Sequence, residues 1–471
     1  MIKIYKIKKR RSIAGIFALL LSFQSCQSSR FDQKPNIIII NIDDMGWRDV
    51  GFMGSEFYET PNLDRLASEG AIFTNAYAAA SNCAPSRACL MSGQWSPRHG
   101  IYTVRSSFRG RSKDRKLIPT ETNITLAKEQ YTLAEVLRDG GYATCHAGKW
   151  HLGNDPTTQG FDLNIGGSHA GKPGNYFPPY KNVELNPPSE DYNLTRLVMD
   201  KALEFVETTD QSFFLYYSPY AVHGPIQPVK ELLPKYERKA SWNGQDNIKY
   251  ATMIENLDKQ VGRLVDLLEA TGKLENTFIV FTSDNGGVYS ITKQWPLRAG
   301  KGSYYEGGIR EPMFAYWKGK IDDGIKIDVP VTNLDFYPTI LEVTGIKKPA
   351  NKILDGNSFA SILSAGNDMP ERPLFWHFPI YLQDGNKETQ DSIFRTRPGS
   401  AIRLGDWKLI QYFENNDIEL YNLKNDIGEK TNLADVEPSK VDELLKILEN
   451  WRSETNAPVP VKLNPDYSNS K

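Results

Sequence analysis

Acidic and amide side chains directly follow two apolar segments of the chain, residues 36–42 and residues 277–282. These side chains are Asp43, Asp44, Asp284 and Asn285. An uninterrupted β-branched run such as 36–42 is typical of a strand buried on both faces of a parallel sheet. The carboxyl ends of parallel strands meet at the edge where open α/β sheets bind ligands. Three carboxylates converging there would repel one another without a cation, and their oxygens suit Ca²⁺ or Mg²⁺. Either cluster alone could serve helix capping and turns, but the pair at matching strand ends favours a metal site.

A cysteine, a proline and an arginine form a third cluster, in the stretch Cys83-Ala84-Pro85-Ser86-Arg87. Pro85 fits the first position of a helix. Cys83 would then lie at the helix N-terminus, where free N–H groups and the helix dipole favour an anion. A lone cysteine beside proline and arginine is more often a small buried apolar residue. Only the motifs around it make a chemical role the stronger interpretation.

Helices alternate with buried strands along most of the chain. Strands are expected at residues 36–42, 212–217 and 277–282, and helices at residues 60–70, 131–138, 194–207 and 253–270. From about Pro373 the pattern changes to antiparallel strand regions, 401–413 and 418–422, and an amphipathic helix, 441–451. We therefore predict an α/β fold, with a large doubly wound, mixed or mostly parallel sheet flanked by helices. A smaller C-terminal α+β subdomain with an antiparallel sheet would follow it.

The N-terminus has the composition of an export signal. A basic stretch precedes the apolar residues 13–23, a run too short to cross a bilayer at about 20 residues per crossing. Cys26 stands where cleavage would fall and resembles a lipoprotein acylation site, although it could be an incidental cysteine in a discarded peptide. We expect an extracytoplasmic protein, periplasmic or anchored to a membrane by a lipid on Cys26. The expected domains are a signal peptide at 1–26, a catalytic α/β domain at 35–370 and the α+β subdomain at 371–471.

The composition of the chain argues against several classes of protein. The 471 residues include 56 Lys and Arg against 57 Asp and Glu, which argues against a dedicated nucleic-acid-binding protein. A hydrophobic fraction of 40% excludes a disordered chain. Four cysteines are too few for a disulfide scaffold, and we expect Cys89 and Cys145 to be free thiols.

The cysteine cluster resembles the formylglycine signature of the type I sulfatases, which belong to the alkaline phosphatase superfamily. The resemblance also includes residues 36–44, 60–70, 148–153 (GKWHLG), 283–287, 300–310 and 420–433. It implies that a dedicated formylglycine-generating or anaerobic maturation enzyme oxidises Cys83 to an aldehyde, whose hydrate is the nucleophile. It also implies one divalent ion, usually Ca²⁺. Gln94 departs from the pattern, since that position is often basic in the family.

The family motifs assign roles residue by residue. The implied catalytic residues are Cys83, Arg87, Lys149, His151, His223 and Lys301, and the implied metal ligands are Asp43, Asp44, Cys83, Asp284 and Asn285. Lys149, Lys301 and the metal would hold the sulfate oxygens. His151 would act as a base, and His223 or Lys301 would protonate the leaving sugar oxygen. The other histidines, His99, His146 and His377, are expected to be structural, except His169, a possible substrate contact.

Residues 160–171 and the aromatic pair Tyr176-Phe177 resemble bacterial exo-sulfatases that act on galactose or N-acetylgalactosamine. We expect these residues to form a loop that closes over one terminal sugar of a sulfated carbohydrate, with His169 in contact. A 4-O-sulfate is the first expectation and a 6-O-sulfate the second. A phosphatase or phosphonate hydrolase of the same superfamily and a non-catalytic glycan-binding protein remain as alternatives.

Overall fold

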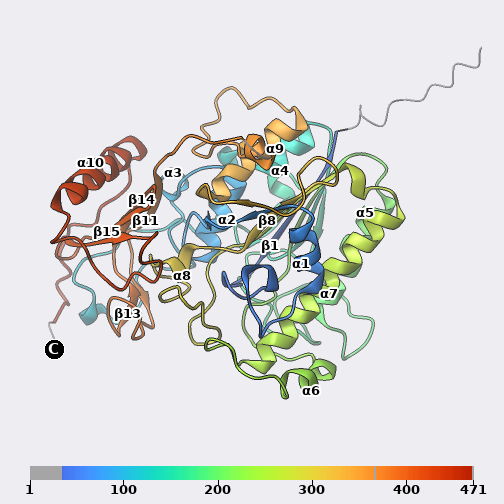
Figure 1. Ribbon diagram of the computed structural model, residues 1–471, viewed down its shortest axis with the longest axis horizontal. Coiled ribbons are helices and arrows are strands. Elements are labelled where there is room, and N and C mark those ends of the chain that lie inside the picture. Colours follow the sequence, from blue (N-terminus) through green and yellow to red (C-terminus); the bar gives the residue numbers. More distant parts are fainter. Residues whose placement is uncertain (1–33, 365–366, 469–471) are drawn as a thin grey trace, which may run out of the picture. The chain divides into compact units, whose positions relative to one another are not determined.

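An eight-stranded, mostly parallel sheet forms the centre of the fold (Figure 1). The computed structural model describes residues 34–364 and 367–468. The strands of this sheet are β1 (Asn36–Ile42), β2 (Ala71–Phe73), β4 (Ala143–Gly148), β5 (Leu163–Ile165), β6 (Phe213–Ser218), β7 (Thr277–Ser283), β8 (Met313–Tyr316) and β9 (Ile325–Ile327). Their order across the sheet is β5-β4-β6-β1-β7-β8-β2-β9, and the first five run parallel. Only β8 is antiparallel to its neighbours β7 and β2.

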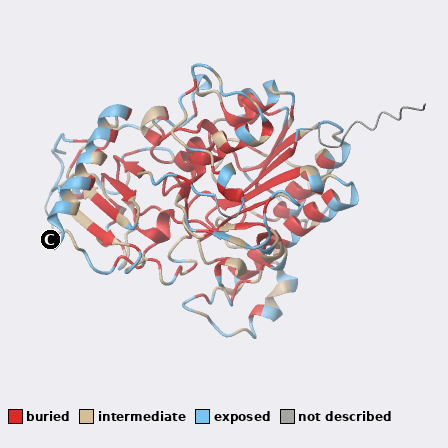
Figure 2. Cartoon of the chain, turned by 45° about the horizontal axis from the view of Figure 1, so that its top comes forward, coloured by how far each residue is buried: buried red, intermediate tan, exposed pale blue. Residues whose placement is uncertain are grey.

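Helices cover both faces of the sheet, which confirms the doubly wound fold. The helices are α1 (Pro61–Ser68), α2 (Cys83–Ser92), α3 (Ser96–His99), α4 (Leu133–Asp139), α5 (Leu194–Thr208), α6 (Leu233–Tyr236), α7 (Ile248–Ala270), α8 (Glu306–Ile309), α9 (Phe336–Thr344) and α10 (Pro438–Thr455). Ile38 and Ile40 belong to a core cluster with α1, α5 and α7, whereas Ile37 and Ile39 belong to one with α2, α4 and α9. Successive side chains of a strand point to opposite faces, so both faces of β1 must be apolar. Figure 2 shows the buried residues concentrated in the sheet and the inner sides of its helices.

The C-terminal region forms the predicted antiparallel sheet. Its strands are β11 (Leu374–Phe378), β14 (Gly399–Leu404), β15 (Trp407–Tyr412) and β16 (Asp417–Asn422), and α10 packs against them. Two small strand pairs complete the fold, β3 (Ala76–Tyr77) with β10 (Val331–Thr332) and β12 (Leu382–Gln383) with β13 (Phe394–Thr396). The chain from Lys34 onward is one compact unit. The division at 370/371 therefore stays a prediction.

Some boundaries differ from those predicted, each for a local reason. The 401–413 region is two strands, because Gly405 turns the chain at a φ of +56°. Helix α7 begins five residues before the predicted 253–270, where the Asn247 side chain accepts a hydrogen bond from the backbone of Tyr250. Helix α2 begins at Cys83 itself, so Pro85 is its third residue rather than its first. Strand β4, with the sequence ATCHAG, has no periodic apolar pattern and was not predicted.

The predicted signal peptide and Cys26 lie outside the described residues. Within the part of the chain that the structure describes, no helix combines the length and apolar character needed to cross a bilayer.

A buried cluster of three charged side chains joins the C-terminal sheet to helix α8. Lys408 on β15 lies 2.9 Å from Glu306 Oε1 of α8 and 2.8 Å from Glu429 Oε1, and all three side chains are inaccessible to solvent. Burial raises the pKa of Glu429 to about 7, although Lys408 opposes the shift. The lysine therefore holds two carboxylates together in a dry environment.

Replacing Lys408 with methionine should destabilise the protein by about 3–5 kcal/mol, because two buried carboxylates lose their common cation. Urea denaturation followed by circular dichroism measures the effect. Lys318→Met is the matched control, since Lys318 pairs with Glu275 on the surface and should change stability by less than about 1 kcal/mol. Equal midpoints for the two variants would contradict this assignment.

Candidate active site

The register of the central strands brings the two acidic clusters together. Ile42 at the end of β1 pairs with Ser283 at the end of β7, so the residues that follow emerge side by side. The Asp44 backbone N–H donates to Asp284 Oδ1 at 3.2 Å, and Asn285 Nδ2 donates to Asp44 Oδ1 at 2.8 Å. Asp44 has a φ of +63°, a conformation that non-glycine residues seldom adopt outside constrained sites. The structure thus brings the two acidic clusters of the sequence together at one place.

Cys83 lies at the start of helix α2, facing this acidic cluster. The Asn82 side chain accepts a hydrogen bond from the Cys83 backbone N–H at 3.1 Å and caps the helix. The Cys83 Sγ lies 3.5 Å from His151 Nδ1 and 4.0 Å from Lys301 Nζ. Burial opposes the thiolate, yet the positive charges of Lys149 and Lys301 bring the pKa of Cys83 below its ordinary value.

Two fully buried cations form ion pairs with the carboxylates of this cluster. Lys149 Nζ donates to both oxygens of Asp43 at 2.8 Å. Arg87 Nε donates to Asp284 Oδ2 at 2.8 Å, and its Nη1 donates to the Lys149 carbonyl at 2.9 Å. Burial raises the pKa of Asp43 to about 6, with Lys149 opposing. Neither Arg87 nor Lys149 lines the cavity described below, so both would act on the site through the acidic cluster.

His151 is held in a constrained position at the end of β4. Its φ is +64°, and a Cβ on Gly171 would lie 2.5 Å from the His151 ring. Glycine at 171 therefore makes room for the imidazole. Burial, with the nearby charges of Lys149 and Arg87, holds the pKa of His151 well below its ordinary value. The ring is neutral at neutral pH and can accept a proton.

His223 faces the cluster from the loop after β6. Its Nδ1 donates to the Gly224 carbonyl at 2.7 Å, which leaves Nε2 facing Asp44 Oδ2 at 3.6 Å. Burial lowers the pKa of His223, and Asp44 opposes the shift. The Tyr176 hydroxyl lies 2.5 Å from the Tyr220 carbonyl oxygen and 2.8 Å from that of His223. Tyr176 is thus a buried support for this loop and does not line the cavity described below.

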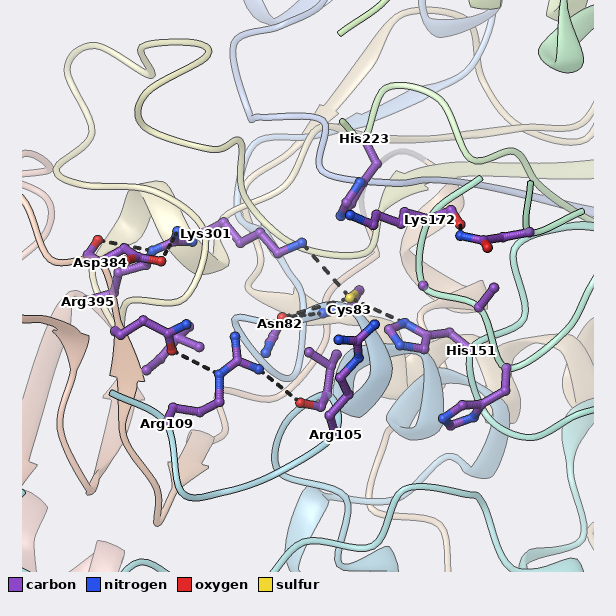
Figure 3. A pocket seen from close by; sticks show the side chains of 17 residues that line it. Asn82, Cys83, Arg105, Arg109, His151, Lys172, His223, Lys301, Asp384 and Arg395 are labelled. Atoms are coloured by element: carbon purple, nitrogen blue, oxygen red, sulfur yellow. Dashed lines mark hydrogen bonds and ion pairs between the residues drawn. The ribbon is translucent and has the colours of Figure 1, made fainter. Parts of the chain in front are cut away.

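A cavity of about 490 Å³ opens above these groups (Figure 3). The predicted site residues that line it are Cys83, His151, His169, His223 and Lys301. The His169 and His151 ring centroids are 6.0 Å apart, and His169 Nδ1 is buried without a hydrogen-bond partner among the described residues. His169 therefore lines the cavity, and its contact with a sugar stays a prediction.

Several polar residues of the cavity wall were not predicted. They are Asn82, Arg105, Arg109, Lys172, Asn182, Gln383, Asp384 and Arg395. They come from three separate parts of the chain and share no motif. Only for Asn82, directly before the cysteine cluster, did the sequence carry a signal, as a helix-capping residue type.

The acidic cluster fits a divalent cation. Ligand atoms of Asp43, Asp44 and His223 lie within 4.8 Å of one another, as do those of Asp43, Cys83 and Asp284. Asn285 Oδ1 is buried and has no hydrogen-bond partner among the described residues. An orphaned amide oxygen beside three buried carboxylates is the donor set of a hard cation. All five predicted ligands therefore meet at one place, and His223 is a sixth group beside them.

A doubly wound sheet, an acidic edge that fits a divalent cation and a cysteine at the start of a helix are together typical of a hydrolase of anionic esters. The chain belongs to the sulfatase family, which it matches over residues 35–346, and residues 300–454 match the C-terminal region of N-sulphoglucosamine sulphohydrolases. It is therefore a sulfuric ester hydrolase, as the sequence predicted, rather than a phosphatase or a non-catalytic binding protein. The family is known for formylglycine and divalent-metal chemistry.

Relatives of known name agree with this assignment. A sulfatase of Formosa agariphila is 33% identical over 96% of this chain and 95% of its own length. Human N-acetylgalactosamine-6-sulfatase is 32% identical over 73% of this chain and 68% of its own. The crystal structure of Ps i-CgsB, 31% identical, superposes with a TM-score of 0.73 over 89% of this chain and 93% of that one. Ps i-CgsB has also been crystallised with k-i-k-neocarrahexaose.

Proposed function

We propose that this protein removes 6-O-sulfate from terminal galactose or N-acetylgalactosamine residues of sulfated glycans. The observation that carries the proposal is its similarity to the N-acetylgalactosamine-6-sulfatases of rat, mouse, dog, pig and human, at 31–33% identity. These relatives favour the 6-O position over the 4-O position that the sequence analysis placed first. The carbohydrate bound by Ps i-CgsB supports a sulfated glycan as the substrate class.

Cys83 is the proposed site of conversion to formylglycine, which supplies a hydrated aldehyde as the nucleophile. The His151 ring, whose Nδ1 lies 3.5 Å from Cys83 Sγ and whose pKa is held low by burial, is the proposed group that takes a proton from the modified residue. Lys301 keeps its charge, because Asp44 raises its pKa despite burial, and it contributes a cation to the cavity wall. Lys301 Nζ, or His223 once its Nε2 carries a proton, would protonate the leaving sugar oxygen.

Asp43, Asp44, Asp284 and Asn285 would hold the proposed ion, most simply Ca²⁺, together with the modified Cys83. When bound, such an ion supplies electrostatic stabilisation to the sulfate oxygens. Arg87 and Lys149 keep the carboxylates ionised and in position. A formylglycine-generating or anaerobic maturation enzyme is the implied partner, and an extracytoplasmic location with a lipid on Cys26 completes the proposal.

A substrate panel tests the sugar and the position. The enzyme, matured by co-expression with a formylglycine-generating enzyme, is assayed for sulfate release from the 4-O- and 6-O-sulfates of galactose and N-acetylgalactosamine, and from glucosamine-6-sulfate. We expect the galacto 6-O-sulfates to have the highest kcat/KM. A site built to bond one hydroxyl rejects its epimer, because buried polar groups would be left unpaired. A preference for the glucosamine ester would overturn the proposed sugar, and a 4-O preference the proposed position.

His169→Ala should lower kcat/KM on the preferred sugar sulfate by roughly tenfold to a hundredfold, because the buried His169 Nδ1 is available to a substrate hydroxyl or sulfate. On a small aryl sulfate, which offers no such hydroxyl, the loss should be within about threefold. Lys181→Ala, an exposed residue beyond the cavity wall, is the control. Equal losses on both substrates would exclude sugar recognition by His169.

A further inference from the structure

One wall of the active-site cavity carries three arginines that the reaction does not use (Figure 3). Arg105 and Arg109 come from the segment between α3 and α4, and Arg395 comes from β13 in the C-terminal region. Arg105 is exposed and has no hydrogen bond or ion pair within the described residues. Its backbone has a φ of +66°, in the left-handed region that a residue of this kind seldom adopts. An unpaired guanidinium held at a cavity wall is available to an anionic ligand.

Arg109 and Arg395 are anchored by hydrogen bonds, and Arg395 also forms an ion pair. Arg109 Nε donates to Gln383 Oε1 at 2.9 Å, and its Nη1 donates to the Val104 carbonyl at 3.1 Å. Arg395 Nε donates to the Asp384 carbonyl at 3.2 Å. The Asp384 carboxylate, whose side chain is 71% exposed, lies 3.7 Å from Arg395 Nη2. These contacts fix the direction of the guanidinium groups; Asp384 offsets part of the Arg395 charge, whereas Arg109 forms no ion pair within the described residues.

The positive charge of this wall is in excess. Burial lowers the pKa of Arg109, and the like charges of Arg395 and Arg105 lower it further, whereas Asp384 and Cys83 oppose the shift. Lys301, the cation beside Cys83, is instead paired with Asp44. Within the described residues, the three arginines therefore form no ion pair with Asp43, Asp44 or Asp284, whose cationic partners are other residues.

The cavity continues past this wall. A second cavity of about 250 Å³ shares Lys301, Asp384 and Arg395 with the first. Arg395 thus stands where the two cavities meet. A sugar next to the one whose sulfate is removed would have space there, beside Arg395, with Arg105 and Arg109 on the wall of the first cavity.

We propose that Arg105, Arg109 and Arg395 form a second anion subsite, which binds a sulfate or carboxylate on the sugar adjacent to the one that is desulfated. The inference takes from the proposed function that the substrate is a sulfated glycan, but it does not depend on which ester is cleaved. Guanidinium groups bind such planar or tetrahedral oxyanions through paired N–H donors. The enzyme then prefers a glycan with two or more anionic groups to an isolated monosulfated sugar.

Calorimetric titration of the full chain carrying Cys83→Ser tests the subsite without turnover. The probes are a galacto disaccharide with one sulfate on its non-reducing sugar, the same disaccharide with a second sulfate on the neighbouring sugar, and one with a carboxylate there. We expect the second anion to lower Kd by about tenfold or more. Comparing the two dianionic probes tells whether sulfate or carboxylate is preferred.

Arg105→Gln, added to the Cys83→Ser protein, should remove most of that gain in affinity. The Kd of the monosulfated probe should change by less than about twofold. Arg111→Gln is the matched control, because Arg111 lies in the same segment, pairs with Asp114 and does not line the cavity. The subsite is overturned if the second anion does not lower Kd, an outcome that includes binding of none of the three probes. It is also overturned if Arg105→Gln weakens the binding of all probes equally. The proposed function is judged separately, by sulfate release from the wild-type enzyme on the substrate panel.

Discussion

Replacing Cys83 with alanine should reduce sulfate release by more than about 10⁴-fold while the protein stays folded. Cys83 is the one cysteine of the described chain that lines the active-site cavity. It lies 3.5 Å from the candidate base His151. Alanine keeps the helix start, since the Asn82 cap bonds to the backbone N–H of residue 83 and not to its side chain alone. The change therefore removes the proposed nucleophile and little else.

Ion chromatography of the released sulfate measures the loss of activity, and thermal denaturation tests whether the variant stays folded. Cys89→Ala is the matched control, because Cys89 is a buried thiol in the same helix, with a pKa raised to about 12 by burial. That variant should keep its activity. Mass spectrometry of the wild-type peptide that contains residue 83 should show the aldehyde in place of the thiol. Residual activity of Cys83→Ala within about tenfold of the wild type would exclude Cys83 as the nucleophile.

Removing the divalent ion should abolish activity and lower the melting temperature. Three buried carboxylates and an unpaired amide oxygen meet at the sheet edge. An ion that binds only the folded state stabilises it by about 2.7 kcal/mol at a concentration one hundred times its Kd. A chelator should reverse both effects, and added Ca²⁺ should restore them. Metal analysis should find about one hard divalent ion per chain.

Asp284→Asn should have the same effect on activity even with Ca²⁺ present. Asparagine keeps the shape of the side chain but removes a charged ligand and the partner of Arg87. Asp258→Asn is the control: Asp258 is also buried and accepts bonds from Asn62 and Leu63, but it lies outside the metal-binding groups. It should affect stability without affecting turnover. Full activity in chelator, or stoichiometric zinc, would refute the assigned site.

The fold class and the acidic site could be predicted because both are local signals. Residues 36–42 and 277–283 are buried throughout and apolar at their centres, 37–40 and 278–281, as a strand covered on both faces must be. Polar residues that directly follow such parallel strands lie at the same edge of the sheet, the one formed by the carboxyl ends of the strands. The strand β4 gave no such signal, since its six residues include Thr144, Cys145 and His146. Its burial comes from its neighbours β5 and β6, which no local pattern reports.

The sequence by itself determined the doubly wound architecture, the nucleophile candidate Cys83 and the acidic groups around it, because each depends on residue type at short spacing. Only the tertiary structure decided which side chains reach the substrate. Lys149 and Lys301 are both lysines beside glycines, yet one is buried under Asp43 and the other lines the cavity. Tyr176 supports a loop, whereas Arg105, in a segment without a motif, faces the ligand space. Segments distant in sequence meet there through long-range packing, and their distances and charges are properties of that packing rather than of any one segment.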